Sequence, residues 1–181
     1  MSLKLNYQLM TSAQLEQALD QLAQEVLKVN AGRKLVFIGI HRRGVPLADR
    51  LAARVGRITA ATQVVCKLDI NLYRDDLTTV AEQPIVRKTD IPSDIHDRDV
   101  ILCDDVLYTG RTVRSALDAL CDFGRMRTIQ LAVLVDRGHR ELPIEANFVG
   151  RQIPTKDNEV VEVKFSEIDG EDAVYVMEKT D

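Results

Sequence analysis

The sequence has few cysteines, no long apolar run and no block of like charges, and each absence excludes a class of protein. Three cysteines in 181 residues, with no CxxC pair, are too few for a disulfide framework or a cysteine zinc site. We expect Cys66, Cys103 and Cys121 to be reduced thiols in the core. The longest apolar stretch, Leu35 to Ile40, is far shorter than the roughly 20 residues that span a bilayer.

The first ten residues, MSLKLNYQLM, contain neither an apolar segment of about 7–15 residues nor a small-residue cleavage site. We therefore expect no secretory signal and a cytoplasmic protein. The net charge of −4 is uneven: residues 155–181 carry three lysines and nine acidic residues, and the rest of the chain is slightly basic. Bulk charge gives no general attraction for nucleic acids, but it leaves room for a local basic site that binds phosphates.

Length and hydrophobic patterning predict one α/β domain over residues 1–181, because a domain averages roughly 150 residues. A capping box, Thr11 with Gln14, begins the first helix, whose pattern ends at Gly32. Further helices are expected at 46–55 and 112–123, and strands at 34–40, 63–68, 99–103 and 128–135. This alternation predicts a parallel sheet flanked by helices. Short strands at 147–149, 160–165 and 173–177 would add a small flap or hood, and residues 69–92 a long flexible loop.

The segment VILCDDVLYTGRT, residues 100–112, carries the informative chemistry. A buried strand delivers Asp104 and Asp105, and a turn rich in threonine and glycine then opens a helix. Free N–H groups at a helix start suit a phosphate, which the two carboxylates would repel. Carboxylates suit hydroxyls, a cation or positive charge that develops on carbon. One ligand needs all of these groups, namely a ribose 5-phosphate whose C1 becomes oxocarbenium-like.

Motifs for other chemistries are missing. The sequence contains no GxxxxGK[ST], no GxGxxG and no GxSxG. His41, His96 and His139 share no spacing typical of metal ligands. These absences argue against a nucleotide-binding P-loop, a Rossmann domain, an α/β-hydrolase and a histidine metal site.

The thirteen-residue segment resembles the 5-phosphoribosyl-1-pyrophosphate (PRPP) binding motif of type I phosphoribosyltransferases. Its form DDVLYTGRTVR is similar to that of the PyrR family, bifunctional pyrimidine operon regulators and uracil phosphoribosyltransferases. Three further segments support this resemblance: GIHRRG at 39–44 resembles the pyrophosphate loop, DINLYRDDL at 69–77 the flexible loop, and VDRGHRELPI at 135–144 a later signature. The resemblance covers nearly the whole chain, in order.

The resemblance implies conversion of uracil and PRPP to UMP and pyrophosphate. Asp104 and Asp105 would hold the ribose hydroxyls and stabilise positive charge at C1, and Arg74 would close over pyrophosphate and exclude water. Arg42 and Arg43 belong to the pyrophosphate loop. The implied PRPP motif comprises Val100, Ile101, Leu102, Cys103, Asp104, Asp105, Val106, Leu107, Tyr108, Thr109, Gly110, Arg111 and Thr112, of which the last four would hold the 5-phosphate.

The same resemblance implies further partners. Arg137 and Val161 are matched to the region near the base. Mg²⁺ would arrive with PRPP and not through direct protein ligands, because a hard cation prefers phosphate and hydroxyl oxygens. The family usually forms dimers or higher homo-oligomers, and UMP or UTP promotes its binding to pyrimidine operon leader mRNA.

Three residues are candidates for RNA binding: His139, Arg140 and Arg151. Against this reading, Glu145 lies where RNA-binding members carry arginine, and the first helix offers acidic residues at positions 16, 20 and 25. Acidic residues at such a surface repel phosphates. The alternatives are therefore an enzyme without RNA binding, or a phosphoribosyltransferase for a purine base, against which the DDVLYTGRTVR and DRGHRELPI forms argue.

Overall fold

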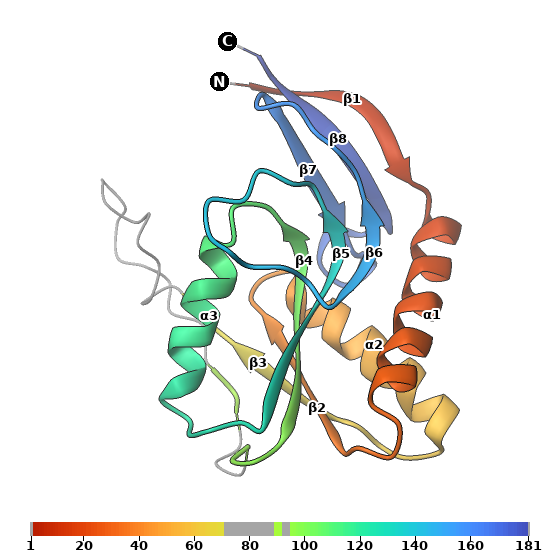
Figure 1. Cartoon of the computed structure of the whole chain (residues 1–181). Helices are drawn as coiled ribbons and strands as arrows, with labels where there is room; N and C mark the ends of the chain where they lie inside the picture. The colour runs from red at the N-terminus through yellow and green to blue at the C-terminus, as the bar shows by residue number, and fades with distance from the viewer. Residues whose placement is uncertain (1, 71–88, 92–94, 181) are drawn as a thin grey trace.

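The computed structural model describes residues 2–70, 89–91 and 95–180, and comprises two sheets and four helices in that part of the chain (Figure 1). The parallel sheet has the strand order β3-β2-β4-β5-β6, and the second, antiparallel sheet has the order β1-β8-β7. The helices are α1 (Ser12–Val29), α2 (Gly44–Thr59), α3 (Arg111–Cys121) and α4 (Ser166–Asp169). The strands are β1 (Ser2–Met10), β2 (Leu35–Ile40), β3 (Val64–Leu68), β4 (Asp99–Leu107), β5 (Thr128–Asp136), β6 (Phe148–Gln152), β7 (Glu159–Lys164) and β8 (Ala173–Thr180).

The predicted parallel sheet flanked by helices is confirmed, and alternating strand residues explain why it has two covered faces. In β2, Leu35 and Phe37 pack with α1 and α2 in one hydrophobic core. Val36 and Ile38 point to the other face and pack with α3 in a second core. Helices α1 and α2 therefore cover one face and α3 the other, as Figure 1 shows. Burial on both faces is the reason that these strands read as continuous apolar runs.

The first helix begins as its capping box predicts. The Thr11 hydroxyl accepts a hydrogen bond from the Gln14 backbone N–H, and the Gln14 side chain accepts one from the Thr11 backbone. Its apolar stripe, which includes Leu15 and Leu19, is fully buried against the sheet and α2. The helix ends at Val29, before the predicted stop at Gly32, because Asn30 caps it through both its backbone N–H and its side chain.

Three sequence expectations need correction. Strand β1 was not expected, and it is the edge of the small hood sheet that it forms with β7 and β8. Strand β4 continues to Leu107, so the two aspartates expected in a loop after it lie within the strand itself. Cys66 and Cys103 are buried free thiols, but Cys121 is exposed because it lies in the last turn of α3, away from that helix's buried stripe.

No helix in the described ranges is long and apolar enough to cross a membrane.

Candidate active site at the carboxyl end of β4

The centre of the site is the last part of β4, where this strand has a neighbour on one side only. Strand β2 pairs with β4 as far as Gly39 and Cys103, whereas β5 continues to pair with it as far as Leu107. Asp104 and Asp105 follow directly after the last residue that pairs with β2. The sheet therefore opens at the two aspartates, in the position where parallel α/β sheets bind ligands.

The two carboxylates are held in a low-dielectric setting. Asp104 is 6% exposed, and its Oδ1 accepts a hydrogen bond of 3.0 Å from the Asp105 backbone N–H. Burial raises the pKa of Asp105 above its ordinary value, although the hydrogen bond with Asp104 and the nearby Arg43 guanidinium lower it. Such a pair strongly favours a ligand that brings hydroxyl donors or positive charge, because either one offsets the cost of burial.

The predicted phosphate turn lies beside Asp104 and forms a cavity of about 250 Å³. The cavity is lined by Asp104, Val106, Leu107, Tyr108, Thr109, Gly110, Arg111, Thr112, Val113 and Ser115. Gly110 has φ +92°, a left-handed conformation that glycine adopts without strain. The first N–H of α3, that of Arg111, donates to Thr109 Oγ1 at 3.3 Å, which satisfies one of the donors at the helix start. The N–H groups that follow in the first turn are where an anion would bind.

The segment 138–144 holds this turn in place. The Thr109 carbonyl accepts hydrogen bonds from the backbone N–H groups of Glu141 and Leu142, at 3.0 and 3.2 Å. The Arg111 guanidinium donates to the Glu141 carboxylate through Nε at 2.6 Å. The predicted later signature is thus physically attached to the predicted phosphate turn, and Arg111 forms part of that attachment.

The predicted pyrophosphate loop is pressed against β4. A Cβ atom on Gly44 would lie 2.3 Å from the Cys103 carbonyl oxygen, so only glycine permits this approach. Arg43 precedes Gly44 and donates through Nε and Nη2 to the Asp169 carboxylate, at 3.1 and 2.8 Å. The Asp169 carboxylate raises the pKa of Arg43, and Asp105 adds to this effect. The loop therefore places a guanidinium between the hood and the β4 carboxylates, whereas Arg42 is exposed.

Arg137 lies on the other side of the turn in a buried aromatic setting. It is 4% exposed, and its guanidinium carbon lies 4.0 Å from the centre of the Tyr108 ring. Its Nε donates to Thr155 Oγ1 at 3.0 Å, and burial lowers its pKa. The Tyr108 ring is also in edge contact with His139, at 5.7 Å between ring centres. Its Nη2 also donates to the Lys156 carbonyl oxygen at 3.4 Å. Arg137 therefore links Tyr108 to the 155–156 backbone, a role that the sequence did not reveal.

Other predicted site residues lie in the hydrophobic core or outside the described residues. The side chains of Val100, Ile101, Leu102 and Cys103 are fully buried, so they form the strand that carries the aspartates and do not line the cavity. Val161 is 7% exposed and belongs to the core beneath the hood. Arg74 lies outside the described residues.

The predicted RNA-binding residues differ in their surroundings. The Arg140 guanidinium donates to the carbonyl oxygens of Tyr108 and Ile144, at 2.7 and 2.9 Å, and to the Asp136 carboxylate. His139 lies 3.2 Å from an Asp157 carboxylate oxygen. Arg151 is exposed on β6. On α1, Glu16 and Asp20 form ion pairs with Arg54, so these two acidic residues are partly neutralised within the chain.

Sequence reasoning missed Asp169, because its partner Arg43 lies 126 residues away in the chain. Helix α4, which places the carboxylate, is a single turn of helix that ends at a left-handed glycine with φ +77°. Among the described residues, no group of three or more His, Cys, Asp or Glu side chains is placed to hold a metal ion.

Comparisons with known proteins define the class. Residues 7–167 match the family model "Phosphoribosyl transferase domain". A hypoxanthine-guanine phosphoribosyltransferase from Bacillus anthracis has the same fold: the TM-score is 0.73 at 17% identity, and the match covers 98% of this chain and 100% of that one. A second structure, a hypoxanthine phosphoribosyltransferase from Staphylococcus aureus, matches with a TM-score of 0.71 at 22% identity, over 95% and 92% of the two chains. The protein is a phosphoribosyltransferase of the type I fold.

Curated relatives narrow the class to one family. The chain is 53% identical to the "Bifunctional protein PyrR" of Deinococcus radiodurans over 174 residues, 96% of this chain and 95% of the relative. It is 52% identical to a protein of the same name from Thermus thermophilus, over 95% and 96% of the two chains. The chain belongs to the PyrR family of bifunctional proteins, and the resemblance drawn from its sequence motifs is confirmed.

Proposed function

We propose that this protein transfers the 5-phosphoribosyl group of PRPP to uracil and releases pyrophosphate. One observation carries this proposal: Asp104 and the phosphate turn Thr109–Thr112 line the same small cavity at the open end of β4. The ribose 5-phosphate would bind to the N–H groups at the start of α3. Its 2- and 3-hydroxyls would then face the two aspartates, which accept hydrogen bonds from hydroxyls.

The carboxylates would act where charge develops. As the bond between ribose C1 and the pyrophosphate oxygen breaks, positive charge grows on C1 and the ring oxygen. N1 of uracil forms the new bond to C1, and its proton passes to water or to the departing pyrophosphate. A carboxylate pair beside the ribose, of which Asp104 is buried and Asp105 half-buried, stabilises this charge more than water does, because it is already oriented and needs no reorganisation.

Pyrophosphate would leave toward the loop that carries Arg43. This guanidinium is oriented by two hydrogen bonds to Asp169 and lies close enough to Asp105 for each to stabilise the charged form of the other. Mg²⁺ would enter as part of the PRPP complex, in which it neutralises phosphate charge. Asp104 and Asp105 fit that complex, because oxygen donors suit both its hydroxyls and its metal ion.

We further propose that the family's second activity, regulation through pyrimidine operon leader mRNA in response to UMP or UTP, is present but depends on few basic residues. The exposed Arg151 supports this role, and the acidic residues of α1 and the exposed Glu145 oppose it. A cytoplasmic homo-oligomer is consistent with both activities.

A base screen tests the enzymatic proposal directly. Purified protein with PRPP and Mg²⁺ is incubated separately with uracil, hypoxanthine, guanine and adenine, and pyrophosphate release is measured. Uracil alone should support release, with UMP as the organic product. Consumption of a purine base without consumption of uracil would overturn the assignment of substrate.

A further inference from the structure

A second concave region lies at the opposite edge of the parallel sheet, where the strands begin. Three cationic side chains stand immediately before three strands: Lys34 before β2, Arg98 before β4 and Arg127 before β5. The strand residues that follow them are in register, because Leu35 pairs with Asp99 and Asp99 pairs with Thr128. Adjacent parallel strands lie about 4.8 Å apart, so the register places three cationic residues on neighbouring strands.

The lining of this region carries more cations than carboxylates. Asp99, which is 1% exposed, accepts hydrogen bonds from Arg127 and lies 3.7 Å from Arg33. Asp97 also lies at this edge. Among the residues that the structure describes here, four cationic side chains, those of Arg33, Lys34, Arg98 and Arg127, lie near these two carboxylates. Like charges next to each other on neighbouring strands destabilise a sheet, and an anion bound among them relieves that repulsion.

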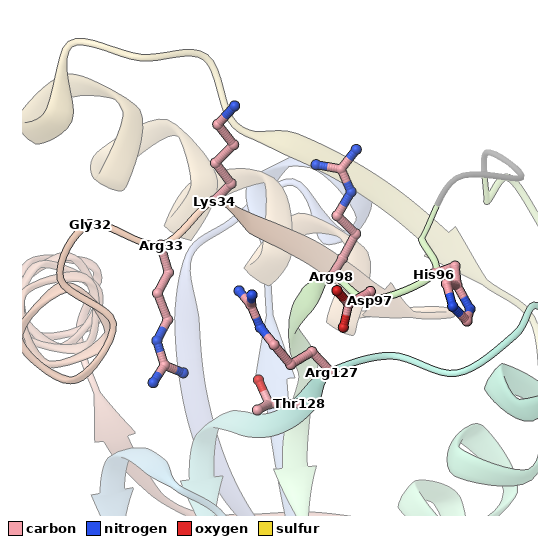
Figure 2. Close-up of a pocket in the computed structure, with 8 residues that line it drawn as sticks. All are labelled: Gly32, Arg33, Lys34, His96, Asp97, Arg98, Arg127 and Thr128. Atoms are coloured by element: carbon pink, nitrogen blue, oxygen red, sulfur yellow. The ribbon is translucent and has the colours of Figure 1, made fainter.

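The charged side chains line a cavity of about 830 Å³, shown in Figure 2. Its lining consists of Gly32, Arg33, Lys34, His96, Asp97, Arg98, Arg127 and Thr128. The cationic side chains in this view come from three separate segments of the chain, and those of Lys34 and Arg98 extend out from the sheet edge. A cationic hollow of this kind is suited to a ligand with several negative charges, such as a chain of phosphates.

An apolar cavity of about 570 Å³ adjoins the cationic one and shares four lining residues with it, Gly32, Arg33, Lys34 and Arg98. Its remaining walls include Leu27, Leu35, Val36, Val55, Val64 and Ile95. Asn30 also lines this cavity and is 1% exposed, and its Oδ1 accepts no hydrogen bond within the part of the chain that the structure describes. A buried acceptor without a partner costs free energy. The Oδ1 atom is covered from solvent, so a ligand with an N–H or O–H donor recovers this cost once the Asn30 side chain turns toward the cavity.

We propose that the two cavities form one binding site for a nucleoside triphosphate, with the base in the apolar part and the phosphates on Lys34, Arg98 and Arg127. A flat, apolar group with hydrogen-bond donors next to a run of phosphates matches both compartments, whereas a nucleic-acid backbone alone would leave the apolar one empty. The site lies at the beginning of the strands, and the catalytic aspartates lie near their ends. A ligand here therefore occupies a place separate from the substrates.

Binding of radiolabelled ATP, measured by equilibrium dialysis at about 0.1 M salt, tests the proposal. The double variant Lys34→Gln with Arg98→Gln should bind one ATP fewer per chain than the wild-type protein. Val64→Glu, which places a carboxylate on an exposed position of the apolar wall, should have the same effect. The matched control, Lys4→Gln with Arg57→Gln, also removes two charges but lies outside both cavities and should keep the wild-type number.

The count of sites distinguishes this proposal from the enzymatic one. If ATP also binds at the catalytic site, the number of ATP molecules bound per chain falls from two in the wild type to one in the test variants. Otherwise it falls from one to zero. Uracil-dependent turnover should be unchanged in the double variant. Inorganic triphosphate should compete with ATP at this site at least tenfold less well than unlabelled ATP, because it cannot use the apolar compartment.

Two results would overturn the proposal. One is an equal number of bound ATP molecules in the wild type, both test variants and the control. The other is unchanged ATP binding in the double variant together with loss of leader RNA affinity, which would assign this basic edge to RNA.

Discussion

At the scale of single residues, the sequence identified the two candidate catalytic aspartates. It did not identify the ion pairs that form between residues far apart in the chain. Asp104 and Asp105 can be recognised as candidates because two adjacent carboxylates before a turn that suits phosphate are seldom needed for folding alone. The pairs Arg43–Asp169 and Arg127–Asp99 join residues 126 and 28 positions apart. Such pairs follow from tertiary structure alone, so no local pattern could predict them.

The first prediction concerns the carboxylates. Asp104→Asn or Asp105→Asn should lower turnover by about 10²-fold or more, because a group that stabilises developing charge contributes roughly 3 kcal/mol. Steady-state turnover with uracil and PRPP measures the effect. The thermal unfolding midpoint should change little, because the sheet is unpaired on one side at both positions. Near-normal turnover in both variants would show that the carboxylates serve only to shape the strand end.

The second prediction concerns Asp99, whose hydrogen bonds from Arg127 and Thr128 lower its pKa to about 2. A carboxyl whose folded-state pKa is depressed stabilises the fold above its unfolded pKa of about 4, and this contribution is lost as pH falls toward the folded value. Asp99→Asn should therefore lower the free energy of unfolding by about 1–2 kcal/mol at pH 7, discounted for the exposed Arg127.

Urea unfolding at a series of pH values measures this contribution. The difference between wild type and Asp99→Asn should shrink between about pH 4 and pH 2. Asp118→Asn is the matched control: its carboxylate pairs with Arg114 on the surface of α3, 51% exposed, and is worth less than about 0.5 kcal/mol. A difference that stays constant with pH would mean that Asp99 acts through packing and not through its charge.

At the scale of elements, periodicity predicted the helices and the buried strands, and their ends were less predictable. Strand β4 extends four residues further because β5 continues beside it, which no property of β4 itself reveals. Strand β1 was missed because nearly all of its residues are exposed, and its partner β8 comes from the other end of the chain. The hood is fastened to the α/β body by Arg43 and by Arg50, which pairs with Glu167 and Asp172 at 2.7 Å.

The third prediction concerns the junction of α2 and β4. Gly44→Ala should lower the free energy of unfolding by about 1–3 kcal/mol, because the added Cβ meets the Cys103 carbonyl and the two elements must separate. Turnover should also fall, since the displaced loop carries Arg43. The control is Gly56→Ala in the same helix. A Cβ atom on Gly56 would lie 3.0 Å from its nearest neighbour, the Ala61 carbonyl oxygen. Equal free energies of unfolding for the two variants, measured in urea, would contradict a tight contact between Gly44 and the Cys103 carbonyl.

At the scale of the whole molecule, the balance between enzyme and regulator depends on surface charge. The sequence predicted a weak RNA surface from Glu145 and the acidic residues of α1, and the structure leaves Glu145 exposed while Arg140 is engaged in internal hydrogen bonds. The basic edge at the start of the strands was not predicted, because Lys34, Arg98 and Arg127 are scattered in the chain and only the sheet register unites them.

The fourth prediction follows from this charge distribution. Glu145→Arg should tighten binding of pyrimidine leader RNA and steepen its salt dependence by about one unit of log–log slope at most, because it adds one cation at the surface. Uracil turnover should stay unchanged, since Glu145 lines neither the β4 cavity nor the pyrophosphate loop. Filter binding at several salt concentrations measures the change. Tight wild-type binding that Glu145→Arg leaves unaltered would place the RNA on a different surface.

The pairing of β1 with β8 has a consequence for the order in which the protein can fold. Ser2 lies opposite Thr180 and Met10 opposite Val174, so β1, which is synthesised before the parallel sheet, pairs with β8, which is synthesised after it. During synthesis, β1 has no sheet partner while the parallel sheet is being completed. The hood can therefore close only after residues 173–180 have emerged, and nascent chains without them should carry a formed α/β body, an unpaired amino-terminal arm and no catalytic turnover.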